Sequence, residues 1–270
     1  MGKILKTVKP HTDFRPTTDF AAKDILFNWV PFDLPKGGAV ELKSISYVMP
    51  GEDAVGHNGA LDFQLLFAKP NDKGEAPTTL GKSSAVISAI TSSLIRPFLI
   101  GSLHLDASEL EDADDTLLGY NMCSTAGYSK AATADIQTAF SPLILEGDHY
   151  AGGTIQSLTY PATTEGNQTI FVAGIAIDAG FNFGTGVLLN QVGDQATSTT
   201  AVGLVTDGTD ADDIFAVGDI VGTGAEYTEI GTVTAVAANT LTVDKVDNAF
   251  NNNDEIYKKH PIVLNFGFEY

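Results

Sequence analysis

Short stretches in which apolar and polar residues alternate recur along the chain, and a two-residue period of this kind predicts β-strands. The clearest stretch covers residues 39–49, where Val40 and Leu42 share one phase and Ile45 and Tyr47 share the other. Because a shift of one residue turns every side chain to the opposite face of a strand, this change of phase predicts a β-bulge between Leu42 and Ile45.

Other alternating or β-branched runs are bounded by Gly, Pro, Asn or Asp, and they predict the remaining strands: 24–30, 61–68, 95–105, 143–145, 149–159, 169–177 and 260–270. About seven or eight strands at these intervals are typical of an antiparallel β-sandwich. The long links at 70–94 and 106–140 favour a jelly-roll-like sandwich over a plain meander.

Helical periodicity is scarce. Residues 107–118, with Asp106 or Ser108 as N-cap, and residues 131–140 are the segments for which we expect short helices. We expect the strand that begins at Asp24 to end before Pro31 and to lead into a turn-rich link at 32–38.

Residues 183–258 have a different character, with fewer aromatic residues and short β-branched runs separated by Gly, Asn and Asp: 215–222, 230–236, 239–243 and 254–257. A module of this size needs closure to protect its strand edges, which predicts a small β-barrel. The return of Phe- and Ile-rich alternation in the last ten residues predicts that the final strand rejoins the first sheet. The expected fold is therefore all-β, with a jelly-roll-like sandwich formed by 1–182 and 259–270 and an inserted barrel formed by 183–258.

The charge is strongly negative and unevenly distributed. The formal net charge is −19, and residues 184–257 hold twelve acidic residues against a single basic one, Lys245. Contacts with phosphate groups need Lys and Arg, so this surface argues against nucleic acid and anionic membranes as partners. The acidic module adds solubility and suits salty surroundings, where screening weakens self-repulsion.

The sequence shows no targeting segment that we recognise and holds a single cysteine. No apolar run approaches the roughly 18 to 20 residues of a membrane helix, and the basic segment 1–10 lacks the apolar stretch of a signal peptide. We therefore do not expect export by the general secretion route. Cys123 is the only cysteine, so it cannot form an internal disulfide, and we interpret it as a small core residue.

A catalytic site would have to draw on the five histidines of the chain, His11, His57, His104, His149 and His260. No nucleophile elbow, zinc-binding pair or phosphate loop accompanies them. Asp148 and His149 form an acid–base pair in the sequence, but such a pair at the start of a strand is more typical of local hydrogen bonding. We expect no enzyme activity, no catalytic residues and no cofactor.

Two acidic stretches, 106–115 and 207–213, are rich in the carboxylates that calcium prefers. Neither has the spacing of an EF-hand loop, so we interpret both as solvated loops and expect no metal site. Tyr120, Tyr128 and Tyr160 lie in or beside expected loops and are the candidates for contact with a glycan.

The segment 25–38, Ile-Leu-Phe-Asn-Trp-Val-Pro-Phe-Asp-Leu-Pro-Lys-Gly-Gly, followed by the runs 40–49 and 61–67, resembles the opening of the β-sandwich in virion proteins of tailed bacteriophages. Residues 141–150 and 170–177 resemble its late strands. The acidic segment with its Val-Gly-Asp and Ile-Gly-Thr-Val motifs is similar to small barrel modules appended to phage structural proteins.

The resemblance implies a repeated, non-enzymatic component of a virion, such as a capsid decoration protein, a head fibre or a tail component. We expect a decoration or cement protein that forms a symmetric oligomer, most simply a trimer, and that contacts other virion proteins such as the major capsid protein. It would be made in the host cytoplasm and located in the virion. The alternatives are a receptor- or carbohydrate-binding fibre module and a hydrolase on a jelly-roll scaffold.

Overall fold

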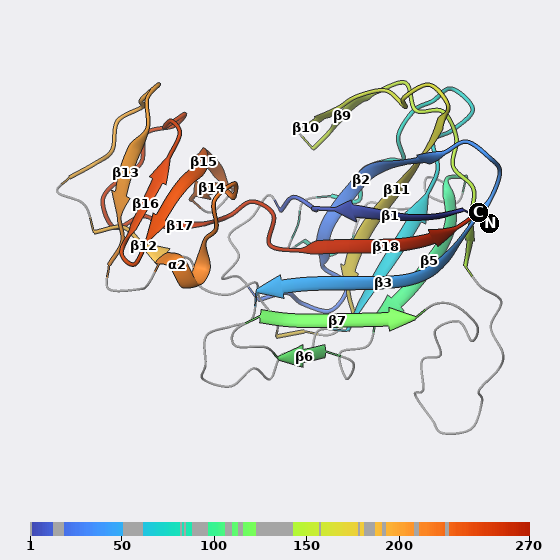
Figure 1. Cartoon of the computed structure of the whole chain (residues 1–270), viewed down its shortest axis with the longest axis horizontal. Coiled ribbons are helices and arrows are strands. Elements are labelled where there is room, and N and C mark those ends of the chain that lie inside the picture. Colours follow the sequence, from blue (N-terminus) through green and yellow to red (C-terminus); the bar gives the residue numbers. More distant parts are fainter. Residues whose placement is uncertain are drawn as a thin grey trace. The chain divides into compact units, whose positions relative to one another are not determined.

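The computed structural model describes residues 2–12, 19–50, 62–81, 83, 85–87, 97–105, 110–112, 116–122, 143–156, 158–177, 179–180, 187–190, 193–207, 211–224 and 227–270. Its contacts divide the chain into two compact units (Figure 1). Unit 1 comprises Met1–Pro10, Asp19–Phe181 and Ile262–Tyr270, and unit 2 comprises His11–Thr18 and Asn182–Pro261. The fold is all-β, as expected, and its sheets are antiparallel.

Unit 1 consists of two facing sheets and a short hairpin. Its strands are β1 (Lys3–Val8), β2 (Ile25–Pro35), β3 (Val40–Pro50), β4 (Phe63–Ala68), β5 (Leu99–Leu105), β6 (Leu110–Asp112), β7 (Thr116–Met122), β8 (Ile144–Leu145), β9 (Gly153–Ile155), β10 (Leu158–Tyr160), β11 (Asn167–Ala176) and β18 (Val263–Glu269). The first sheet has the order β1-β18-β3-β7-β6, with β8 also paired to β3, and the second has the order β2-β11-β4-β5.

The strand order identifies a jelly roll. The strands of unit 1 with six or more residues are, in chain order, β1, β2, β3, β4, β5, β7, β11 and β18. Counted in that order, the first sheet reads first-eighth-third-sixth and the second reads second-seventh-fourth-fifth. This is the double Greek key of a jelly roll, and it confirms the expected sandwich. The last strand, β18, pairs with β1 and β3, so the prediction that it rejoins the first sheet is also confirmed.

Aromatic side chains from the two sheets fill the space between them. The rings of Phe32 and Phe266 stack at a centroid distance of 5.6 Å, and the Phe67 ring meets Phe266 edge-on at 5.7 Å. Tyr47 contacts Phe63 edge-on at 5.3 Å. All five side chains are buried, and burying a large apolar side chain stabilises a fold by about 1.5–3 kcal/mol.

The outer face of the second sheet is buried as well. Trp29 and Phe171 belong to a cluster on this face, which Leu80 and Tyr150 cover. The indole N–H of Trp29 donates to the carbonyl oxygen of Thr78 (2.9 Å), which fixes the covering segment. Because both of its faces are covered, β11 is buried from Gln168 to Ala176.

The sequence pattern predicts the bulge in β3 correctly, whereas its predictions for the end of β2 and for the described residues of 107–118 are wrong. Phe268 pairs with Leu42 and Gly267 with Ser44, so Lys43 is the extra residue, and the predicted bulge is confirmed. The predicted end at Pro31 is wrong, because β2 continues to Pro35. In the described part of the sheet β2 is an edge strand, where a missing N–H is tolerated.

The prediction of a helix at 107–118 is wrong for those residues of the segment that the structure describes. Residues 110–112 form β6, and β7 begins at Thr116 and pairs with β3. Long-range pairing with β3 therefore overrides the local helical signal. The helix expected at 131–140 lies outside the described residues.

Unit 2 is a barrel-like module with its own core. Its elements are β12 (Val187–Leu188), β13 (Val202–Val205), α2 (Ala211–Ile214), β14 (Ile220–Thr223), β15 (Thr228–Ala237), β16 (Thr240–Val243) and β17 (Glu255–Lys258). The strand order is β12-β17-β14-β15-β16-β13, and a bridge between Leu189 and Thr206 brings the two ends of this sheet together. Leu204, Ile230 and Ile256 are fully buried in the centre, so this module buries its own apolar surface.

Candidate functional site

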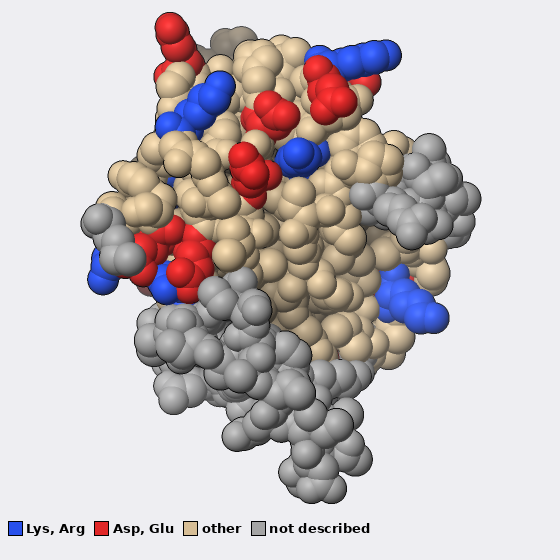
Figure 2. Space-filling model, turned by 90° about the vertical axis from the view of Figure 1, so that its right-hand side faces the viewer, with Lys and Arg blue, Asp and Glu red and all other residues tan. Residues whose placement is uncertain are grey.

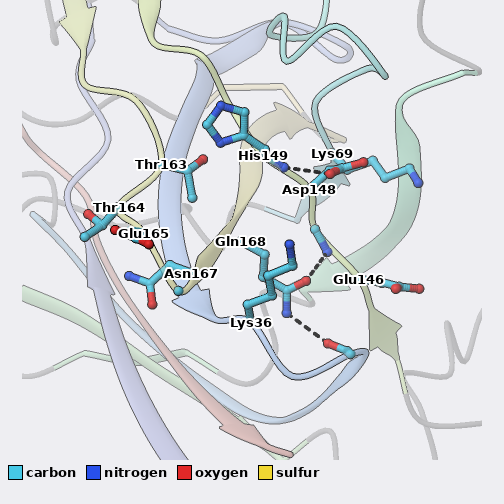
Figure 3. Close-up of a pocket in the computed structure, with 13 residues that line it drawn as sticks. Lys36, Lys69, Glu146, Asp148, His149, Thr163, Thr164, Glu165, Asn167 and Gln168 are labelled. Atoms are coloured by element: carbon cyan, nitrogen blue, oxygen red, sulfur yellow. Dashed lines mark hydrogen bonds between the residues drawn. The ribbon is translucent and has the colours of Figure 1, made fainter.

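The candidate site in unit 1 is an open polar pocket of about 560 Å³ (Figure 3). Three segments line it: the turn after β2, with Lys36 and Gly38, the segment 146–149, and the segment 163–168 that leads into β11. Lys69 completes the wall. Strands and turns far apart in the sequence therefore converge on one polar hollow.

Gln168 forms the floor of the pocket and is only 4% exposed. Its Oε1 accepts a hydrogen bond from the N–H of Gly147 (3.0 Å). Its Nε2 donates to the carbonyl oxygens of Gly38 (2.9 Å) and Pro35 (3.2 Å). One amide side chain thus ties the turn after β2 to the segment before Asp148, and its polar groups are used in holding the fold.

A second set of hydrogen bonds supports the wall that leads into β11. The hydroxyl of Thr169 donates to Oδ1 of Asp33 (2.7 Å) and lies 2.6 Å from the hydroxyl of Thr163. The Thr163 hydroxyl also accepts from the N–H of Tyr150 (2.6 Å), and Oδ2 of Asp33 accepts from the N–H of Thr164 (3.2 Å). These contacts fix the wall and make the pocket a preformed hollow.

Asp148 and His149, the acid–base pair noted in the sequence, both line the pocket. The carboxylate Oδ1 of Asp148 accepts from the main-chain N–H of His149 (2.7 Å), and the main chain of Asp148 pairs with Thr169. Figure 3 shows the imidazole turned away from the carboxylate. The hydrogen bond between the two residues is therefore local and does not orient the imidazole as a base.

The charges around the pocket are mixed. Two lysines, Lys36 and Lys69, and three carboxylates, those of Glu146, Asp148 and Glu165, line it. Figure 3 shows the Lys36 side chain reaching into the hollow and that of Lys69 pointing outward. On the face of the molecule in Figure 2, described basic and acidic side chains are likewise interspersed. Such a pocket suits a small ligand with several hydroxyl groups better than a strongly charged ligand.

Of the tyrosines proposed for glycan contact, the structure describes the side chain of Tyr160 alone. It is partly buried and packs against the apolar cluster that contains Trp29, Tyr150 and Phe171. Burial, with a smaller electrostatic contribution from Tyr150, raises the pKa of Tyr160 to about 12. Burial also raises the pKa of Tyr150. Tyr160 is therefore packed against the sandwich, whereas Tyr128 and the side chain of Tyr120 lie outside the described residues.

The other residues considered for catalysis or metal binding do not come together in the described structure. His104 Nε2 lies 3.4 Å from Oδ2 of Asp62 on the second sheet, and His57 and Cys123 are outside the described residues. The acidic stretches 106–115 and 207–213 are only partly described, as β6, Asp207 and the first residues of α2. In the described part of the chain, no group of three His, Cys, Asp or Glu side chains has the geometry to hold a metal ion.

Sequence reasoning missed a polar cluster in unit 2. Lys259 is 9% exposed, forms an ion pair with Glu229 and places its ammonium 5.5 Å from the ring centre of Tyr227. The His11 ring lies 6.2 Å from that of Tyr227 and 6.4 Å from that of His260. The mirrored dipeptides Pro-His at 10–11 and His-Pro at 260–261 were the signal in the sequence, because they flank the two boundaries of the unit.

We expect Gln168→Leu to destabilise unit 1 by about 1–3 kcal/mol, since the N–H of Gly147 and the carbonyl groups of Gly38 and Pro35 lose their buried partner while the side-chain volume is nearly kept. Urea denaturation measures this loss. Asn167→Ala is the matched control at the neighbouring position, where only the main chain is hydrogen-bonded to Thr164, and it should be nearly neutral. Equal stability of the two variants would show that the amide of Gln168 does not hold the pocket floor.

No helix in the described part of the chain is long and apolar enough to cross a membrane. No protein-family model matches the chain, and no curated protein sequence is significantly similar to it.

Proposed function

We propose that this chain is a non-enzymatic structural protein of a virus particle, a decoration or cement protein that binds to the capsid as a symmetric oligomer. The observation that carries the proposal is the jelly roll interrupted between its seventh and eighth strands by a self-contained acidic barrel. Jelly rolls are recurrent building blocks of viral capsids. A loop of such a domain tolerates the insertion of a separate module, which adds a new surface and leaves the jelly roll unchanged.

The chemistry of the candidate site supports a structural role. Gln168 and Thr163, which line the pocket, and Asp33, which is hydrogen-bonded to its wall, use their polar groups to hold the turns and strands of the sandwich together. The carboxylate of Asp148 is engaged by the main chain. A catalytic constellation would instead direct a base and a nucleophile toward a shared reacting atom.

Because jelly rolls also occur in lectins, the pocket favours one second candidate, a carbohydrate-binding fibre module. Its volume of about 560 Å³ and its polar lining would accommodate a sugar. Among the described residues that line it there is no Phe, Tyr or Trp, so the stacking of these rings on a sugar, which many sugar sites use, is not supplied by this lining. Titration of the protein with a panel of glycans separates this candidate from the first.

The proposal predicts that the protein co-sediments with virus particles in a density gradient, in many copies per particle, and that the isolated protein has a mass near three times 28.4 kDa. Antibody labelling of the particles and multi-angle light scattering measure these two properties. Particles lacking their decoration, mixed with the purified protein, are the control for specific binding. Protein found only in the soluble fraction would contradict the virion role, and a monomer in solution and on the particle would contradict the trimer.

A further inference from the structure

One edge of the first sheet of unit 1 offers main-chain hydrogen-bonding groups that no described strand uses. The N–H of Gly2 donates to Tyr270 O (2.9 Å) and the N–H of Tyr270 donates to Gly2 O (3.0 Å), so this pair exchanges both hydrogen bonds. The register continues without a shift along β1. In an antiparallel ladder such pairs alternate, so the peptide groups of Lys3, Leu5 and Thr7 point away from β18.

The side chains on this edge are basic and apolar. Lys3, Leu5, Thr7 and Lys9 are all exposed, and Leu5, in the middle, is 68% exposed. In the described sheet, β1 pairs with β18 alone. A leucine flanked by lysines beside open peptide groups is a surface on which another strand could dock.

The opposite edge of the same sheet is formed by β6, which pairs with β7. Among the described strands none lies on the other side of β6. Its sequence is Leu110-Glu111-Asp112, with two acidic residues and no basic one. By sequence, the strand at one edge of the sheet is therefore basic and the strand at the other edge is acidic.

This charge pattern selects among the ways in which two copies can meet. Two β1 edges would place lysines against lysines, and two β6 edges would place acids against acids; like charges across a strand pair are destabilising. Lysines also discourage an edge from pairing with unrelated strands. A β1 edge beside a β6 edge brings opposite charges together and gives the open peptide groups a partner.

We infer that β1 of one copy docks along β6 of the next copy, so that the first sheet continues from subunit to subunit. Every neighbouring pair in β1-β18-β3-β7-β6 is antiparallel, so β1 and β6 run in the same direction. A rotation axis along the strands then gives a parallel pair at each contact. Such a contact is head-to-tail, and a suitable rotation closes it into a ring. The inference rests on the symmetric oligomer in the proposed function and not on its place in a virion.

Charge reversal at each edge of the full-length chain tests this interface. The variant Lys3→Glu/Lys9→Glu makes both edges acidic, and the variant Glu111→Lys/Asp112→Lys makes both basic. Light scattering should give 28.4 kDa for each variant alone and a higher mass for their equimolar mixture, and the chain with all four substitutions should regain the wild-type mass. The matched control is Lys36→Glu/Lys73→Glu, which changes the charge equally at exposed positions outside the two edges and should keep the wild-type mass.

A second variant tests the main chain without a change of charge. Leu5→Pro removes an outward N–H that β18 does not use, so the melting profile should be retained while the oligomer dissociates. The inference is overturned if the two charge-reversed variants keep the wild-type mass, if their equimolar mixture stays monomeric, or if the wild-type chain is monomeric at low salt. Loss of the virion role would appear separately, as absence of the wild-type protein from particles.

Discussion

Removal of residues 259–270 is expected to unfold unit 1. This deletion takes out β18, which lies between β1 and β3 in the first sheet. It leaves β1 without the strand that holds it and opens the hydrogen-bonding edge of β3. No other described strand of the sheet contacts both neighbours in this way, so the gap cannot close by a small shift.

The energetic loss exceeds what a domain of this size tolerates. Leu264, Phe266 and Phe268 are at most 2% exposed, and each such side chain contributes about 1.5–3 kcal/mol by burial. Their sum is comparable to the total stability of a typical domain, about 5–15 kcal/mol. Far-ultraviolet circular dichroism during heating, with hydrogen exchange of the second sheet, measures the result.

The matched control is a chain that lacks only Tyr270, whose side chain is half exposed. This shorter deletion loses the two hydrogen bonds to Gly2 and should lower the melting temperature by a few degrees at most. If the chain ending at residue 258 melts like the intact protein, β18 is not an integral strand of the sandwich and the jelly-roll topology is wrong.

Local patterns in the sequence were sufficient for the strands whose two faces differ. The change of phase between Leu42 and Ile45 marked the bulge at Lys43, because one face of β3 is buried and the other is not. The same alternation in 263–269 identified β18 and, with the preceding acidic module, its return to the first sheet. In both cases the signal lies within a few residues of the feature.

Features that depend on distant partners were not predictable from the sequence. Residues Leu117 and Leu118 fit a helical pattern, and only the pairing of β7 with β3 makes them part of a strand. The polar pocket depends on Gln168, which bonds to Gly38 at a separation of 130 residues. No local motif signals such a contact, and a glutamine between Asn167 and Thr169, just before the predicted strand, has the pattern of an ordinary polar residue.

Excision of residues 184–257, replaced by a short Gly-Ser bridge, is expected to remove the folding transition of unit 2 and to leave unit 1 folded. The buried cluster of unit 2 consists of residues between Leu189 and Ile256, and its described strands pair only with one another. The two termini of an inserted domain usually lie close together, so a short bridge should span them. Unit 1 should keep its melting temperature within a few degrees in calorimetry.

A point substitution in the full-length chain is the control, because it unfolds unit 2 without shortening the chain. Ile230 is fully buried in the core of unit 2, so Ile230→Asp should abolish the transition of this unit by burying a charge and should spare the other. The excised chain and this variant should then share one remaining transition. If unit 1 melts in both proteins at a much lower temperature, the two units do not fold independently.

Excision also tests where the subunits meet. The segment 184–257 holds twelve acids and one lysine, and burial of so many carboxylates would need cations that the segment does not supply. The barrel should therefore face solvent, and the excised chain should remain an oligomer, because β1 and β6 belong to unit 1. An excised chain that folds but stays monomeric would place the barrel in the interface and would contradict an outward-projecting module.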